Sequence, residues 1–472
     1  QSVKDMLVFG PMSAPGDSVA EDSRLFWKEG STLRFGTMRE IYASFLKGSK
    51  LEVMSVVRHH DSPYSKSSFP TMDNSRIIFS PVGQVIDHGL REVHRVILHN
   101  GKSIEITEDH SLICSDGFTT KFYPCALPEL DRIISVDDYP ISIEDTSNFD
   151  EEMASFLGLW MADGSYCWAD KDQTTTHGVE ISTGNNSQIV GWLKRFSVRY
   201  KRDLFEAAVY KEVNENALSA HDLSAQYNMN MNYAHHIIWK IKNGWKPVRD
   251  KTKVFSIKGN GDVRLWSKEL SSAVLSCFGN TRSATKRVPQ FIFTSGNNMV
   301  AAFLRGYFSG DGSAHNGIRG SRVDCSSVNR HLLEDVSVLL DRLGIKHNIT
   351  SGYIPSMWSK NKQYKLVVDS GLHVQKFLSN IGFIKNIPKM DNVKSKAKKH
   401  RELSLRGIRS IEKIGIKQVY DISVPSTEMF VVNGILCHNS GSLIVDKNNK
   451  AIALLFAGSD KVTVGIPIGR VL

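Results

Sequence analysis

The chain has 472 residues, enough for about two to four domains of typical size. Hydrophobic residues at 41% and charged residues at 23% exclude a disordered or fibrous protein, and the net charge of +10 suits an acidic partner such as nucleic acid. The sequence has no apolar run of the ~20 residues that span a bilayer and no signal-peptide pattern at its N-terminus, so we expect a cytoplasmic protein with no membrane partner.

Short runs that alternate apolar and polar residues fill positions 18 to about 135, as in "KLEVMSVVRHH" and "SRIIFSPVGQVIDHGL". Gly, Asn and Asp separate these runs, which predicts an all-β unit. Between about 150 and 395, helical patterns alternate with strands. After a basic, polar connection at 391–403, the β pattern returns in "SIEKIGIKQVYDISV" and "MFVVNGILCHN". The sequence therefore predicts a β unit that is interrupted by a mixed α/β insert.

Two segments inside the insert resemble each other: "FLGLWMADGS" (156–165) and "FLRGYFSGDGS" (303–313). Each predicts an apolar helix with two small residues about one turn apart on one face, Gly158 with Ala162 and Gly306 with Gly310. Such faces allow two helices to approach closely, which would bring Asp163 and Asp311 together at the helix ends. Paired carboxylates of this kind can hold Mg²⁺. The alternative is two buried helices that each end in an Asp-Gly turn.

This pair resembles the two signature helices of LAGLIDADG homing endonucleases, which cut long DNA sites with one metal-binding aspartate from each helix. The resemblance implies a monomeric enzyme at 150–395, with Asp163 and Asp311 binding Mg²⁺ or Mn²⁺ and a saddle-shaped sheet against double-stranded DNA. Lys286 in "ATKRVPQFIF" precedes the second aspartate as a catalytic lysine does in that family, and Lys365 in "QYKLVV" is a candidate for its partner. Such lysines would stabilise phosphate charge or help activate water; the alternative for Lys365 is a surface lysine beside a strand.

The segment 218–244, "LSAHDLSAQYNMNMNYAHHIIWKIKNG", predicts a helix-turn-helix. Ser219 and Asp222 form a helix-capping pattern. Apolar residues fall where such a core needs them, at Leu223, Tyr227, Ile237, Ile238 and Ile241. Four polar residues are then expected to face DNA: Asn230, Asn232, His235 and Lys240. An ordinary helical hairpin is the alternative.

The flanking β unit resembles the splicing framework of inteins, which excise themselves from a host chain. Ser18 opens "SVAEDS", "ITEDHSL" has the family's TxxH spacing, and "VYDISV" and "NGILCHNS" match its terminal blocks. The resemblance implies a horseshoe-like, all-β Hint domain formed by 18–135 and 403–439. It also implies excision of 18–439, with ligation of Asp17 to Ser440 and with no cofactor. The residues that it assigns to splicing are Ser18, Thr107, His110, Asp421, His438, Asn439 and Ser440.

The sequence departs from that family at one position. Many inteins have a histidine eleven residues before the terminal Asn, where this chain has Glu428. We therefore expect the role of that histidine in the later steps to pass to Asp421 or to Glu428 itself.

The segments outside 18–439 are short, 1–17 and 440–472, and are expected to be host segments attached covalently to the insertion. Joining them produces "GDSGS", which resembles the nucleophile loop of trypsin-like serine proteases. Three alternatives remain open. The endonuclease could be degenerate and only bind DNA, the chain could be a free-standing DNA endonuclease that does not splice, or the insertion could stay permanently in a protease.

Overall fold

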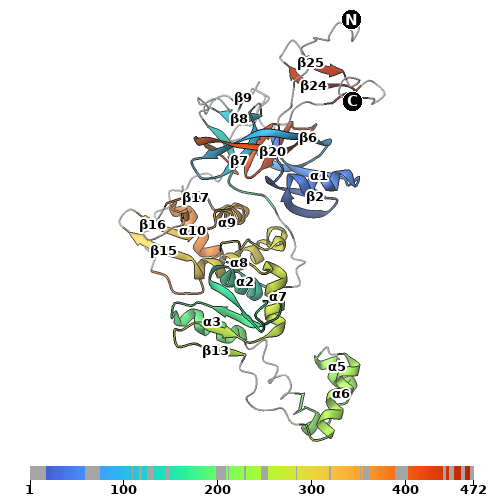
Figure 1. Cartoon of the computed structure of the whole chain (residues 1–472), viewed down its shortest axis with the longest axis vertical. Helices are drawn as coiled ribbons and strands as arrows, with labels where there is room; N and C mark the ends of the chain where they lie inside the picture. The colour runs from blue at the N-terminus through green and yellow to red at the C-terminus, as the bar shows by residue number, and fades with distance from the viewer. Residues whose placement is uncertain are drawn as a thin grey trace.

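The computed structural model describes residues 18–467 except for gaps at 59–74, 109, 116–119, 125–131, 142, 144–148, 198–208, 211, 228–229, 246–253, 283, 318–319, 351, 354–361, 389–401, 439–442, 446–450 and 459–462. Figure 1 shows a β-rich body and a mixed α/β body that follow one another along the long axis, with a pair of helices at the far end. Within the described ranges, no helix is long and apolar enough to cross a membrane.

The β-rich body contains a closed barrel built from both ends of the chain. Its strand order is β1-β20-β6-β7, with bounds Val19–Ala20, Ile408–Ser423, Gln84–Leu98 and Ser103–Thr107. The two long strands β6 and β20 are antiparallel and pair along nearly their full length. The short strand β1 lies between β20 and β7, because Val19 pairs with both Tyr420 and Ile106. Residue 18, just before β1, is thereby fixed beside β7 and β20, whose residues follow it by about 90 and 400 positions.

Two further sheets complete this body. One has the order β3-β2-β4-β5, at Thr32–Thr37, Arg24–Glu29, Leu51–Arg58 and Ser75–Pro81. The other has the order β19-β10-β22-β8-β9, at Leu403–Arg406, Ile133–Val136, Ile435–His438, Ser111–Ser115 and Thr120–Pro124, with β21 (Met429–Val432) paired to β22. Helix α1 (Met38–Leu46) begins at a capping box in which Thr37 and Glu40 satisfy each other's backbone N–H groups. Strands from before and after the α/β body therefore share sheets.

The α/β body consists of two halves with the same order of elements. Each half has a four-stranded sheet in which the last strand in sequence lies between the second and the third. The orders are β11-β12-β14-β13 and β15-β16-β18-β17. The first half contains α2 (Glu151–Asp163), β11 (Gly164–Trp168), β12 (Thr176–Ile181), α3 (Ser187–Ser197), β13 (Phe255–Ile257), β14 (Val263–Leu265) and α7 (Lys268–Phe278). The second contains α8 (Asn297–Gly310), β15 (Gly312–Gly317), β16 (Gly320–Ser327), α9 (Arg330–Arg342), β17 (Asn348–Ile349), β18 (Tyr364–Val368) and α10 (Gly371–Asn380).

Two additions interrupt this repeat. Helices α5 (Ala220–Tyr227) and α6 (Met231–Lys242) lie between α3 and β13, and a short 3₁₀ helix, η3 (Gln290–Thr294), precedes α8. Figure 1 shows α5 and α6 side by side, away from the sheets. They have a small core of their own, which includes Leu223, Ala234 and Ile237.

The β-rich and α/β bodies share a continuous apolar core. Phe35 of β3 stacks on Phe293 of η3 with ring centroids 4.3 Å apart, and Phe26 of β2 packs edge-on against Tyr139. A separate apolar cluster fills the barrel around Val19, Ile106 and Ile422. After the barrel, β23 (Leu443–Val445), β24 (Ala451–Gly458) and β25 (Thr463–Pro467) form a three-stranded antiparallel sheet.

Candidate functional site

Ser18 is fully buried at the start of β1. Its backbone N–H donates to Thr107 Oγ1 at 3.3 Å, and the Thr107 N–H donates back to the Ser18 carbonyl at 3.0 Å. The turn after β7 continues with His110, whose N–H donates to the Thr107 carbonyl at 3.1 Å. His110 is fully buried as well. The structure therefore brings Ser18 to Thr107 and places His110 in the same turn.

A second histidine contacts Ser18. His88 Nδ1 lies 2.6 Å from Ser18 Oγ, and the sequence interpretation did not single it out. On the other side of β1, Asp421 is buried in β20, one residue after the Tyr420 that pairs with Val19. The Asp421 carboxylate accepts the Ile422 N–H at 2.7 Å.

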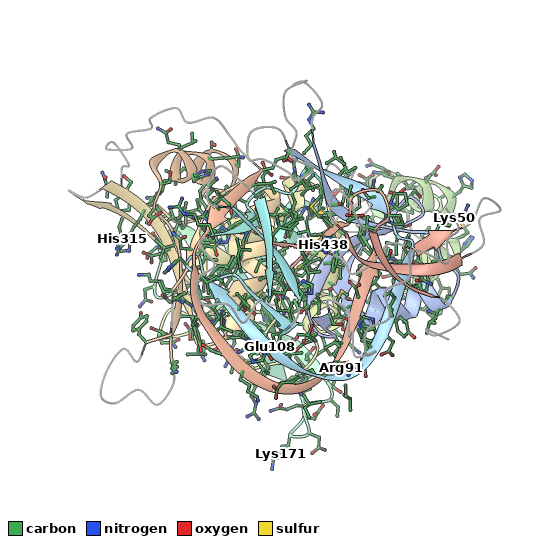
Figure 2. The ribbon with its side chains drawn as sticks, turned by 90° about the horizontal axis from the view of Figure 1, so that it is seen from above. Lys50, Arg91, Glu108, Lys171, His315 and His438 are labelled. Atoms are coloured by element: carbon green, nitrogen blue, oxygen red, sulfur yellow. The ribbon has the colours of Figure 1, made fainter. Side chains whose placement is uncertain are left out.

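Strand β22 leads to the C-terminal residues of the set predicted to act in splicing. Cys437 pairs with Leu112, two residues after His110, and His438 pairs with Met429 of β21. His438 is half-buried, and Figure 2 labels it among the strands of the β-rich body. Exposed Glu428 directly precedes Met429 and has a positive φ of 55°. Asn439 and Ser440, and Asp17 before Ser18, lie outside the described residues.

Helices α2 and α8 cross at backbone contact. A methyl group added at Gly158 would stand 1.9 Å from the carbonyl oxygen of Phe303, and one at Gly306 would stand 1.8 Å from that of Ser155. A Cβ on Gly310 would meet Asp163 Oδ2 at 2.7 Å. The small residues thus allow the close approach predicted from sequence. They also place Asp163 next to Gly310, the residue before Asp311.

A lysine from a later segment contacts the C-terminal end of each helix. Lys286 Nζ donates to the carbonyl oxygens of Trp160 at 3.0 Å and Gly164 at 2.6 Å, at the end of α2. Lys385 Nζ contacts the carbonyl oxygens of Gly310 at 3.4 Å and Gly312 at 2.7 Å, at the end of α8. A positive charge is favourable at this negative end of a helix.

The structure places Lys365 differently. Its Nζ lies 3.1 Å from Asp324 Oδ1, an oxygen that also accepts from Ser313 Oγ at 2.8 Å. Lys385, rather than Lys365, occupies the position in the second half that Lys286 occupies in the first. A short repeat could have revealed it, since "KRVP" at 286–289 and "KNIP" at 385–388 share a lysine, an aliphatic residue and a proline.

The paired carboxylates sit in an environment that opposes their charge. Burial, followed by the neighbouring Asp163 charge, raises the pKa of Asp311 to about 7 against the opposing effect of Lys286. Burial raises the pKa of Asp163 too, while Lys286 and Lys385 oppose this shift. Burial lowers the pKa of Lys286 to about 8 and also lowers the pKa of Lys385. A divalent cation would relieve the repulsion between the two carboxylates.

The donor set suits a hard cation, because carboxylate oxygens are the ligands that Mg²⁺ and Mn²⁺ prefer. Among the described residues, no three His, Cys, Asp or Glu side chains gather at one point. An ion held by Asp163 and Asp311 would therefore take its other ligands from water, phosphate or backbone carbonyls, as Mg²⁺ commonly does.

The predicted capping pair is present in the α5–α6 hairpin. The Ser219 N–H donates to the Asp222 carboxylate at 2.9 Å, and the Asp222 N–H donates to Ser219 Oγ at 3.2 Å. Of the expected core residues, Leu223, Ile237 and Ile241 are buried and Ile238 is half-buried, while the Tyr227 side chain lies outside the described part. The four residues expected to face DNA are all exposed: Asn230, Asn232, His235 and Lys240. Asn230 also caps α6, because its side chain accepts the Asn232 N–H at 2.9 Å.

Comparison with known proteins gives a family match and several similar proteins. Residues 298–382 match the family model described as LAGLIDADG-like domain. The chain is also similar to a DNA polymerase of Thermococcus sp. (strain GE8), with 26% identity over 391 residues that cover 78% of this chain and 20% of the polymerase. A DNA polymerase of Thermococcus litoralis is 22% identical over 458 residues, covering 92% of this chain and 24% of that protein. The chain thus spans about a fifth to a quarter of the length of these relatives.

The solved structures similar to this chain include two inteins of different coverage. An Ssp DnaB mini-intein variant covers 90% of this chain and 99% of its own, with 9% identity and a TM-score of 0.26. An intein from a hyperthermophile covers 26% of this chain and 73% of its own, with 18% identity and a TM-score of 0.21.

Proposed function

We propose that this chain splices itself, releasing residues 18–439 and joining Asp17 to Ser440. The observation that carries this proposal is the position of Ser18, held between β7 and β20 with its N–H on Thr107 and with the His110 turn beside it. A hydroxyl placed next to the peptide bond that precedes it can attack that bond without any external reactant.

The proposed reaction begins with an N→O acyl shift. Ser18 Oγ attacks the carbonyl carbon of Asp17, the C–N bond breaks, and an ester and a free amine replace the amide. Thr107 can hydrogen-bond the oxyanion, and His110 can protonate the departing amine. Ser440 Oγ then attacks the ester carbonyl, which transfers the host segment to Ser440 and frees the Ser18 hydroxyl.

Release at the other junction uses Asn439. Its side-chain amide nitrogen attacks its own carbonyl carbon, forming a cyclic imide and breaking the bond to Ser440. We assign protonation of the departing amine to His438, which follows the Cys437 that pairs with Leu112 of β8. An O→N shift then leaves an ordinary Asp17–Ser440 peptide bond.

The comparisons support an inserted element. This chain matches a limited part of DNA polymerases, while its own ends join into "GDSGS", a sequence typical of a serine protease. A segment shared between such different proteins is expected of an insertion that moves between hosts.

Replacement of Asn439 tests the splicing mechanism. Asn439→Ala should abolish ligation, because cyclisation needs the side-chain amide, and should still allow cleavage before Ser18. Gel electrophoresis and mass spectrometry of the purified precursor would separate the products. Normal ligated product from this variant would rule the mechanism out.

We further propose that the α/β body is a homing endonuclease that cuts double-stranded DNA at the intein-free host allele. Asp163 and Asp311 would hold Mg²⁺ or Mn²⁺, which when bound stabilises the charge that develops on phosphate. Lys286 and Lys385 add positive charge beside the carboxylates. The exposed residues of α5 and α6 would extend the contact along DNA, with phosphate contacts giving affinity and base contacts giving specificity.

The two activities can be separated by substitution. Asp163→Asn and Asp311→Asn should each abolish cleavage of DNA that encodes the joined Asp17–Ser440 sequence, and should leave splicing intact. Asp172→Asn is a matched control, because Asp172 is exposed on the loop between β11 and β12. If the unsubstituted protein splices and binds this DNA without cutting it, the endonuclease is degenerate and the cleavage proposal fails.

After splicing, Ser440 would act as the nucleophile of the host serine protease. A serine-protease nucleophile uses its own backbone N–H and that of the glycine two residues before it as an oxyanion hole. His438 occupies that earlier position in the precursor, and Gly16 occupies it after ligation. In the full-length host, a fluorophosphonate probe should therefore label Ser440 in the ligated product and not in the unspliced Asn439→Ala precursor. Equal labelling would contradict this role.

A further inference from the structure

His88 owes its position to an irregularity in strand β6. Val419 of β20 pairs with Gly89, and the next residue, Tyr420, pairs with Asp87. The register thus advances by two residues in β6 for one in β20, which makes His88 the inserted residue of a β-bulge. Gly89 beside it has a φ of +71°, a conformation that glycine adopts readily. Bulges re-aim a side chain next to active sites.

The bulge aims His88 at Ser18. Because Tyr420 also pairs with Val19, the same point of β20 fixes both the bulge and the start of β1. The result is a contact of 2.6 Å between His88 Nδ1 and Ser18 Oγ. Ser18 is fully buried, whereas His88 is half-buried.

We propose that His88 is the general base that activates Ser18 for the first acyl shift, an inference that rests on the splicing function proposed above. A serine hydroxyl is a weak nucleophile and needs an adjacent base. With its proton on Nε2, the neutral imidazole accepts the Ser18 Oγ proton at Nδ1 as Oγ bonds to the Asp17 carbonyl carbon. His110 gives a proton to the nitrogen as the C–N bond breaks. Proton exchange with solvent then restores both histidines.

The two histidines act on different atoms of Ser18. The Ser18 N–H, which becomes the departing amine, is directed at Thr107 in the turn that carries His110. The Ser18 hydroxyl is directed at His88 on β6. Ser18 thus contacts both the turn after β7 and strand β6. His110 acts as the acid and His88 as the base, so no single imidazole has to do both.

The test uses a precursor with Asn439→Ala, in which ligation is blocked and ester formation at Ser18 is read as hydroxylamine-induced release of residues 1–17. In that background His88→Asn keeps a hydrogen-bond acceptor near the position of Nδ1 but cannot take up the proton. Release should slow by about 100-fold or more, the usual contribution of a general base. His94→Asn is the matched control, since His94 is a half-buried histidine on the same strand, and its rate should stay unchanged.

A thiol at the nucleophile position separates a base from a structural residue. A cysteine has a pKa of ~8.5 and is partly ionised at neutral pH without help. In a Ser18→Cys background, His88→Asn should therefore slow release by less than about 10-fold. Unchanged release in the serine background, or the same penalty in both backgrounds, would overturn the assignment. If the precursor with His88 intact forms no hydroxylamine-sensitive bond at all, the splicing proposal fails instead.

Discussion

Gly306 of α8 lies against Ser155 of α2 so closely that a methyl group on Gly306 would stand 1.8 Å from the Ser155 carbonyl oxygen. Gly158 has the reciprocal relationship with Phe303 at 1.9 Å. Backbone atoms in two packed helices cannot move aside as a flexible side chain can. The absence of a Cβ at Gly158 and Gly306 therefore determines how closely the helices approach, and with it the distance between Asp163 and Asp311.

Gly158→Ala and Gly306→Ala should each push the helices apart and abolish DNA cleavage. Overpacking of this kind costs about 1–3 kcal/mol or more in free energy of unfolding, measurable by thermal or denaturant unfolding. Gly191→Ala is the matched control, because the nearest atom to a Cβ there is the far end of Arg195 at 3.7 Å. Alanine in helix α3 should stabilise by about 0.5–1 kcal/mol. Equal stability of all three variants would contradict the backbone-contact account.

The raised pKa of Asp311, about 7, predicts opposite effects of pH on the metal-free fold and on metal binding. An aspartate in an unfolded chain has a pKa of ~4, so the folded protein favours the protonated acid. The stability from this group is full below pH ~4 and is lost as pH rises through about 7. Metal binding needs the carboxylate, so it should strengthen over the upper part of that range.

The measurement is the Tm with and without millimolar Mn²⁺ between pH 5.5 and 8.5. The rise in Tm caused by the metal should be small at pH 5.5 and should grow through pH 7. In Asp311→Asn the metal-induced rise in Tm should be small at every pH, because one of the two carboxylate ligands is lost. A metal-induced shift that is independent of pH in the unsubstituted protein would show that Asp311 is not a ligand.

Asp335 of α9 joins the two bodies of the protein. It receives Arg287 through Nε and Nη2, both at 2.6 Å, and forms an ion pair with Arg24 of β2. Arg24 also lies over the Phe35 ring, 4.3 Å from its centroid. Because Asp335 is buried, removing it leaves guanidinium charge unpaired at the interface.

Asp335→Ala should therefore lower the free energy of unfolding by about 3 kcal/mol, as measured in urea. Glu92→Ala is the comparison, since the Glu92–Lys413 pair at 2.7 Å is solvent-exposed and exposed pairs contribute little. A loss no larger than that of Glu92→Ala would show that the interface does not depend on this carboxylate.

The exposed face of α6 predicts a salt-dependent contribution to DNA affinity. If Lys240 neutralises one phosphate, Lys240→Ala should reduce the slope of log K against log salt by about 0.9. Fluorescence anisotropy with a labelled duplex at several salt concentrations measures this slope. Lys47→Ala provides the control, because Lys47 is an exposed lysine at the end of α1 in the β-rich body. An unchanged slope for Lys240→Ala would remove α6 from the DNA interface.

The sequence by itself determined the local elements and the residue sets that repeat or match spacing rules. Alternating apolar residues predicted the strands near both ends, and small residues one turn apart predicted two helices in close contact, which the structure contains at Gly158 and Gly306. The Ser219–Asp222 cap was also readable, because a cap depends on residues three positions apart. These features are local, and local geometry follows directly from residue order.

Only the tertiary structure decided which of several similar residues reach the sites. His88 contacts Ser18 because β6 and β20 pair with a bulge at that point. Lys385, and not the predicted Lys365, reaches the end of α8, because the residues after α10 return to that helix. Asn230, expected only to face DNA, caps α6. Each outcome depends on the register or packing of elements that are distant in sequence, and such pairings are set by the whole core rather than by any local pattern.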